Sequence, residues 1–173
     1  MIYIIDANNL AGKMGILEED RFDKILTDDV DKFFQEKSHE VFLVFDSSDP
    51  MGDQEQKEKI KVVFAPKDNK HYFCADDKIL EIAKNKLVQI NIGEGLTIVS
   101  DDIDLKDKIE KQAQEVERQN KLNFLSCSDF LEKINKTAEN VNDDFFEPRE
   151  AEKQDLSDEE QAEINEELRQ IWN

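Results

Sequence analysis

Short apolar runs that alternate with helical segments constrain the fold of this chain more than any other feature of its sequence. The runs are rich in β-branched residues, as is typical of strands that are buried on both faces of a sheet. We expect strands over residues 2–5, 41–45, 61–65, 96–100 and 122–125. We expect helices over residues 18–37, 75–87, 105–119 and 126–134. The alternation predicts an α/β fold, a three-layer sandwich in which helices cover both faces of a mostly parallel central sheet.

Three connecting segments carry local signals. Gly12 and Gly15 predict a loop after the first strand. Residues 53–60 are polar and are expected to be helical or loosely ordered. Ser126 and Asp129 form an S-x-x-D capping box, which predicts that a short helix begins at Ser126.

The composition changes near residue 138, and this change divides the chain of 173 residues in two. We expect a single domain over residues 1–137, which is long enough to bury a sizeable core. Residues 138–173 are expected to form an acidic linker followed by a C-terminal amphipathic helix. Its narrow apolar stripe consists of Ile164, Leu168, Ile171 and Trp172. The stripe either packs back on the domain or binds a partner protein.

Acidic residues follow three of the expected strands, and they set the main question about function. They are Asp6, Asp46 and the group Asp101, Asp102 and Asp104. In parallel sheets, ligands bind beyond the carboxyl ends of the strands, so we expect these acids to meet at one edge. Like charges at such short distances oppose folding, unless they point into water or surround a cation.

The spacing of these acids suggests which of them point toward a common site. Alternation beyond the strand at 96–100 would place Asp102 and Asp104 on one side, with Asp101 opposite and the apolar Ile103 between them. The choice between Asp101 and Asp102 stays open at this point.

A further acidic pair, Asp76 and Asp77, begins the expected helix at 75–87. Helix capping explains one of the two acids without any role in function. Asp76 precedes Ile79 by three positions, so the two share a helix face. We therefore expect Asp76 to lie toward the sheet edge and Asp77 to face solvent.

The donor types narrow the choice of cation. Several carboxylates without a matching set of His and Cys favour Mg²⁺ or Mn²⁺ over Zn²⁺. Two such ions about 3.5–4 Å apart stabilise the attacking and leaving oxygens of a phosphodiester. The segment from Asp6 to Asn9 has two interpretations. It is either a polar turn, or it contains a metal ligand, Asp6, whose orientation Asn9 fixes.

Three short motifs in this order resemble the PIN-like nucleases, and more narrowly the YacP-like members of their NYN branch. The motifs are Asp6-Ala7-Asn8-Asn9, Ala75-Asp76-Asp77-Lys78-Ile79 and Ser100-Asp101-Asp102-Ile103-Asp104. The resemblance covers residues 1–135 and leaves the acidic extension outside it. The late motif of YacP-like proteins often has one clear acid, whereas this chain has three.

The resemblance implies a metal-dependent endoribonuclease that cleaves single-stranded RNA by two-metal-type hydrolysis. Water would be the nucleophile, and the products would carry 5′-phosphate and 3′-hydroxyl ends. Asp6, Asp76, Asp102 and Asp104 would surround Mg²⁺ or Mn²⁺, and Asn9 and Ser100 would support them. The family is also associated with cleavage of mRNA on the ribosome, which makes the ribosome a candidate partner.

The net charge of −19 disfavours non-specific binding to duplexes or membranes. An RNA-binding surface must therefore be local. Its candidate residues are Lys13, Lys67, Lys70 and His71, each of which is equally well explained as solvated surface. Asp46 is either a supporting residue near the metals or a cap of the Ser47-Ser48 turn.

A second function class is compatible with the same sequence. In this alternative the chain is a non-catalytic binding module, whose acidic surface and C-terminal helix recruit a basic protein or a ribosomal component.

Cys74 and Cys127 match no metal spacing, and the N-terminal apolar run is too short for a signal peptide. We therefore expect a reduced, cytoplasmic protein with no membrane partner.

Overall fold

The computed structural model describes residues 1–46, 53–57, 59–65, 74–91 and 93–139. They form a six-stranded sheet with the order β3-β4-β2-β1-β5-β6. The strands are β1 (Ile2–Asp6), β2 (Glu40–Asp46), β3 (Asp53–Gln56), β4 (Ile60–Ala65), β5 (Leu96–Val99) and β6 (Leu122–Leu125). The helices are α1 (Ala7–Met14), α2 (Phe22–Phe34), α3 (Ala75–Gln89), α4 (Ile103–Glu115) and α5 (Cys127–Glu139), with a short 3₁₀ helix at Gln119–Lys121. All strand pairings are parallel except that of β3 with β4.

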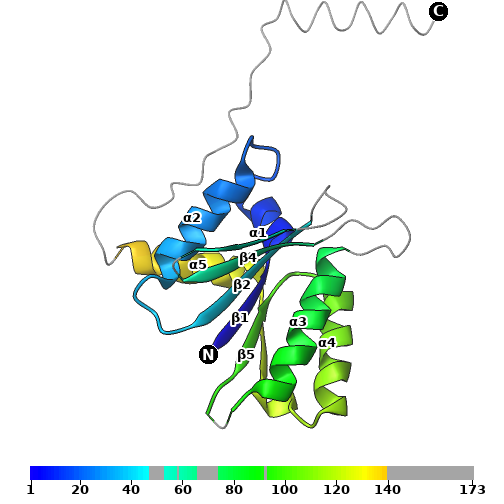
Figure 1. Cartoon of the computed structure of the whole chain (residues 1–173). Coiled ribbons are helices and arrows are strands. Elements are labelled where there is room, and N and C mark those ends of the chain that lie inside the picture. Colours follow the sequence, from blue (N-terminus) through cyan, green and yellow to red (C-terminus); the bar gives the residue numbers. More distant parts are fainter. Residues whose placement is uncertain (47–52, 58, 66–73, 92, 140–173) are drawn as a thin grey trace, which may run out of the picture.

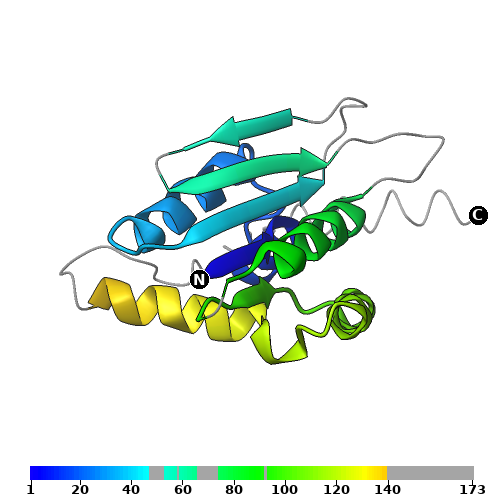
Figure 2. The same ribbon diagram turned by 60° about the horizontal axis from the view of Figure 1, so that its bottom comes forward.

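Helices cover both faces of this sheet, which confirms the predicted α/β fold with a mostly parallel sheet (Figure 1, Figure 2). Helices α3 and α4 lie side by side on one face, and α1, α2 and α5 lie on the other. No helix among the described residues is both long and apolar enough to cross a membrane.

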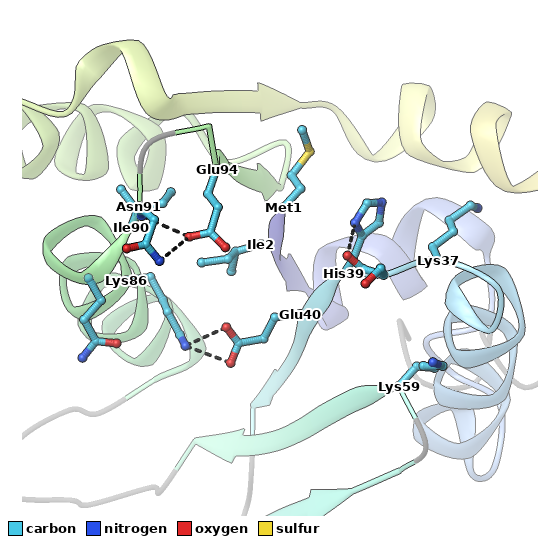
Figure 3. A pocket seen from close by; sticks show the side chains of 12 residues that line it. Met1, Ile2, Lys37, His39, Glu40, Lys59, Lys86, Ile90, Asn91 and Glu94 are labelled. Carbon is cyan, nitrogen blue, oxygen red and sulfur yellow. Dashed lines mark hydrogen bonds and ion pairs between the residues drawn. The ribbon is translucent and has the colours of Figure 1, made fainter.

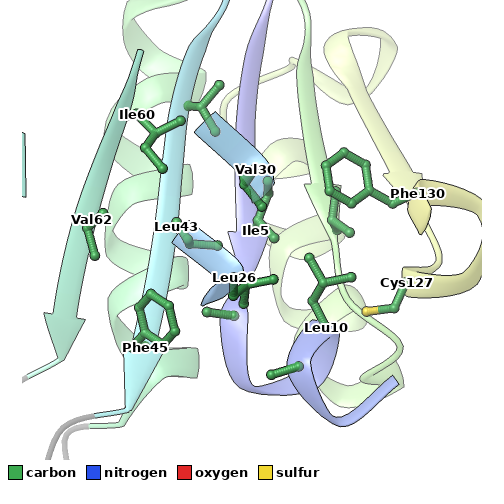
Figure 4. Close-up of a cluster of buried hydrophobic side chains, with 14 of the residues drawn as sticks. Ile5, Leu10, Leu26, Val30, Leu43, Phe45, Ile60, Val62, Cys127 and Phe130 are labelled. Atoms are coloured by element: carbon green, nitrogen blue, oxygen red, sulfur yellow. The ribbon is translucent and has the colours of Figure 1, made fainter. Parts of the chain in front are cut away.

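The central strand β1 shows why the sequence forms three layers. Its side chains alternate between the two faces of the sheet. Ile2 and Ile4 pack in the core beneath α3 and α4. Ile5 packs in the core beneath α1, α2 and α5 (Figure 4), and Tyr3 packs against the same cluster. A strand that is apolar at successive positions is therefore buried on both sides, as expected for a parallel sheet.

An aromatic cluster joins three elements on the α2 and α5 side. Phe34 and Phe130 are fully buried, and their ring centroids lie 6.2 Å apart. Tyr3 of β1 lies 5.0 Å from Phe34, and Phe33 lies 5.5 Å from Phe130. These contacts lock α5 and α2 onto the sheet. The beginning of α5 lies close to the carboxyl end of β5, as shown by the hydrogen bond that the Cys127 backbone N–H donates to Asp101 at 2.9 Å.

The structure corrects two local expectations. The segment at 53–60, expected to be helical or loosely ordered, contains strand β3, in which Gln54 pairs with Val63 of β4. An edge strand tolerates such polar residues because one side of it faces solvent. The loop expected at Gly12 is a helix instead, because Asp6 caps α1 and α1 continues to Gly15, whose φ of 75° ends it.

Other boundaries lie close to the predictions. The capping box of α5 is confirmed, because the Ser126 hydroxyl oxygen accepts a hydrogen bond from the Asp129 backbone N–H at 3.0 Å. Helix α2 is shorter than the predicted span 18–37, and α4 begins two residues earlier than expected. The predicted C-terminal helix lies outside the described residues, and the proposed domain boundary at 137 stays a prediction.

Candidate active site

The order of the strands creates a switch point at β1. The chain passes from β1 to β2 and β4 on one side, and then crosses to β5 and β6 on the other. Ligands of such sheets bind where the connections diverge, beyond the carboxyl ends of the strands. At this edge Ile5 pairs with Val99, so Asp6 and Ser100 come next on adjacent strands.

Asp6 is the most deeply buried acid at this edge, with 5% of its surface exposed. One carboxylate oxygen accepts the Asn9 backbone N–H at 3.1 Å, and the other accepts the Ser100 hydroxyl at 2.9 Å. Burial raises the pKa of Asp6, and the hydrogen bonds from Asn9 and Ser100 oppose that rise. The carboxylate of Asp46 raises the pKa of Asp6 further. The fold thus holds Asp6 in one orientation at an electrostatic cost.

Ser100 connects Asp6 to a second acid, Asp102. The hydroxyl oxygen of Ser100 accepts the Asp102 backbone N–H at 3.1 Å while its proton is donated to Asp6. The Asp102 carboxylate caps α4, since its Oδ1 accepts the Leu105 backbone N–H at 3.0 Å. Ser100 is therefore placed to fix the spacing of the two acids.

Asp76 lies in the first turn of α3 and accepts no hydrogen bond within the described part of the chain. Burial raises the pKa of Asp76, and the carboxylates of Asp6, Asp102 and Asp46 raise it further, in that order. Lys108 of α4 acts in the opposite direction. Asp76 thus interacts with the other acids of this edge, as its spacing from Ile79 predicts. Its neighbour Asp77 instead accepts a weak contact from the Cys74 thiol at 3.6 Å.

The other two acids of the late motif, Asp101 and Asp104, have different surroundings. Asp101 accepts the Cys127 backbone N–H at 2.9 Å and so caps α5. Asp104 is exposed and makes no hydrogen bond or ion pair within the described residues. The expectation from strand alternation is wrong here because helix α4 begins at Ile103. Ile103 is accordingly 72% exposed and does not separate two acids of a strand.

The predicted basic residues are only partly described. Lys13 is exposed in the last turn of α1. Lys67, Lys70 and His71 lie outside the described residues. Lys108 is a further cation near these acids that was not predicted, although its position four residues after Asp104 places the two on one face of α4.

The donor set fits a hydrated cation better than a closed cage. Among the described residues, no three His, Cys, Asp or Glu side chains are placed to hold one metal ion. Mg²⁺ commonly binds through one or two carboxylates and keeps several waters. Asp6, Asp76 and Asp102 fit that mode in donor type. Asp76 is the best suited of the three, because no hydrogen bond in the described structure occupies its oxygens.

A separate pocket of about 440 Å³ lies at the opposite, amino edge of the sheet (Figure 3). It contains the ion pair between Glu40 and Lys86, at 2.8 Å. None of the acids discussed above lines it. This pocket is therefore unrelated to the acidic edge.

A mostly parallel α/β sheet with acids gathered at its switch point is the arrangement expected of a PIN-like nuclease domain. The chain belongs to the YacP-like NYN domain family, whose sequence profile matches residues 3–173. The match includes the acidic extension, which was expected to lie outside the resemblance.

One solved structure supports the same fold. The chain is similar to a crystal structure of a mutant of Rae1 (YacP) from Bacillus subtilis, with a TM-score of 0.61. The two share 16% sequence identity, over 82% of this chain and 78% of that one. At this identity the similarity concerns the fold alone. None of the curated proteins compared with the chain matches its sequence.

Proposed function

We propose that this protein is an endoribonuclease that cleaves single-stranded RNA with the help of Mg²⁺ or Mn²⁺, with mRNA on the ribosome as one candidate substrate. One observation carries the proposal. The carboxylates of Asp6 and Asp102 both act on the carboxylate of Asp76 at the switch point of a YacP-like NYN domain, and Ser100 bridges Asp6 and the backbone of Asp102. The raised pKa values of Asp6 and Asp76 are typical of acids at functional sites.

Each residue has a distinct part in this proposal. Asp6, Asp76 and Asp102 would surround a hydrated cation, which would bind one or two of them directly and the rest through water. Ser100 would fix the spacing of Asp6 and Asp102. A divalent cation bound here supplies charge neutralisation and Lewis-acid polarisation of a phosphodiester. Asn9, through its backbone N–H, helps to orient Asp6. Lys108 and Lys13 are the described cations that would attract the RNA backbone to an otherwise acidic edge.

The direct test is cleavage of a fluorescently labelled single-stranded RNA by the purified full chain. We expect cleavage with Mn²⁺ or Mg²⁺, none with EDTA, and products with 5′-phosphate ends. The assay is repeated with ribosomes and a translated mRNA. A folded protein that neither binds these ions nor cuts RNA under any of these conditions would refute the proposal. It would favour the non-catalytic binding module.

The proposal also predicts unequal effects of two neighbouring acids. Asp102→Asn should lower the cleavage rate about 100-fold, because it removes a carboxylate that interacts with Asp76. The amide still accepts the Leu105 N–H, so the melting temperature should change little. Asp104→Asn is the matched control, with the same change of charge two residues away, and its loss should be much smaller. If both variants lost the same cleavage rate, Asp104 would be a metal ligand, as the family resemblance implies.

A further inference from the structure

We propose that Asp46 is a positioning residue, which holds the first turn of α3, and with it Asp76, over the sheet edge by accepting a hydrogen bond rather than by its charge. The inference rests on the proposed nuclease function for its kinetic consequences. Its structural part stands on the contacts of Asp46 alone.

Helix α3 begins without a cap of its own. Its N-cap residue is Cys74, whose side chain makes no capping hydrogen bond. The first helical N–H, that of Ala75, donates instead to Oδ1 of Asp46 at 2.8 Å, across 29 positions of sequence. Ala75 is 3% exposed, so loss of this acceptor would leave a poorly hydrated N–H without a partner.

Asp46 is itself held in place from the other side. Its backbone N–H donates to the side-chain Oδ1 of Asn8 at 2.9 Å. Asn8 lies in the first turn of α1, two residues after Asp6. Asp46 also ends strand β2, where it pairs with Ala65 of β4. A continuous link therefore runs from α1 through the end of β2 to the beginning of α3.

This link joins α1, which Asp6 caps, to α3, which carries Asp76. Asp76 directly follows Ala75, so the hydrogen bond at Ala75 sets where its carboxylate lies relative to Asp6. The link needs an acceptor oxygen at position 46, and it does not need a negative charge. The charge even opposes the site, because the Asp46 carboxylate raises the pKa of both Asp6 and Asp76. A metal ligand at this position would require the carboxylate.

Two substitutions at one position separate these roles. Asp46→Asn keeps an acceptor oxygen, and we expect kcat and the Mn²⁺ dependence of cleavage to stay within about threefold of wild type. Asp46→Ala removes the acceptor, and kcat should fall about tenfold while KM changes little. Asp107→Ala, which removes another exposed acid of this chain, is the matched control for net charge and should behave like wild type.

Amide hydrogen exchange provides a readout that does not depend on catalysis. The amides of Ala75 and Asp76 should exchange about tenfold faster in Asp46→Ala than in Asp46→Asn. Asn8→Ala should accelerate the same amides, because it releases the Asp46 N–H. If the wild type cuts no RNA, the proposed function fails, and the exchange data still decide the link.

Two results would overturn the proposal. Equal loss of activity in Asp46→Asn and Asp46→Ala would show that the charge matters and would indicate a ligand. Unchanged exchange at Ala75 in Asp46→Ala, in a protein with wild-type circular dichroism, would show that α3 does not depend on Asp46.

Discussion

Asp76→Asn should abolish RNA cleavage and, at neutral pH, make the folded protein more stable. The two effects have one cause. The Asp76 carboxylate is partly buried among Asp6, Asp102 and Asp46, and it accepts no hydrogen bond from the described residues. Its removal relieves repulsion and breaks no described contact. We expect a loss of cleavage of about 100-fold or more. We expect a gain in the free energy of unfolding of about 0.5 kcal/mol, the size of a solvent-screened charge interaction.

The pH dependence of this gain has a definite sign. Because the pKa of Asp76 is raised in the fold, its ionised form destabilises the wild type above that raised pKa. As the pH falls toward the ordinary aspartate pKa of about 3.9, the wild-type carboxyl takes up its proton and the penalty disappears. The stability difference between Asp76→Asn and wild type should therefore be greatest near neutral pH and vanish in acid.

Asp77→Asn is the matched control for this prediction. It removes an acid from the same turn of α3, and so loses the same favourable interaction with the helix N-terminus. It should be slightly less stable than wild type and should retain cleavage. Urea unfolding of the three proteins at several pH values gives the comparison. An Asp76→Asn protein less stable than Asp77→Asn at pH 7 would contradict the picture of mutually repelling acids.

Phe130→Ala should lower the free energy of unfolding by about 3–5 kcal/mol, the largest stability effect that we expect in the chain. The ring is fully buried and contacts Tyr3, Phe33 and Phe34, so its loss would leave a cavity between α2, α5 and β1. Lys133→Ala, on the exposed side of the same helix, should change stability by less than about 0.5 kcal/mol. Chemical denaturation measures both variants, and a loss below about 1 kcal/mol for Phe130→Ala would contradict this packing.

Part of the site could be predicted because it follows from regular geometry. Parallel strands end at one edge, so the sequence predicts that Asp6, Asp46 and the acids that follow β5 meet there. Helical spacing from Ile79 predicts that Asp76 lies toward this edge, and the interactions of Asp76 with Asp6 and Asp102 agree with that placement. These inferences depend only on the periods of strands and helices, which the apolar residues of this sequence record clearly.

The remaining features depend on contacts that no local pattern records. Strand β3 has a polar sequence, and it is a strand because β4 offers it an edge to pair with. Helix α4 begins at Ile103 because Asp102 caps it, so strand alternation does not extend to Asp104. The partner of the Ala75 N–H lies 29 residues away in the sequence, at Asp46. Tertiary contacts decide such cases, and they are invisible to periodicity.

The acids of this edge also cap the helices around it. Asp6 is the N-cap of α1, Asp102 is the N-cap of α4, and Asp46 accepts a hydrogen bond from the first N–H of α3. A mutational scan that records cellular abundance and enzymatic activity separately should distinguish helix capping from the proposed role in the cation site. Asn or Ser at these positions can still accept the capping hydrogen bond, so abundance should tolerate them. Activity at positions 6 and 102 should tolerate aspartate alone. Asn and Ser variants at positions 6 and 102 should therefore accumulate in cells at normal levels although they are inactive.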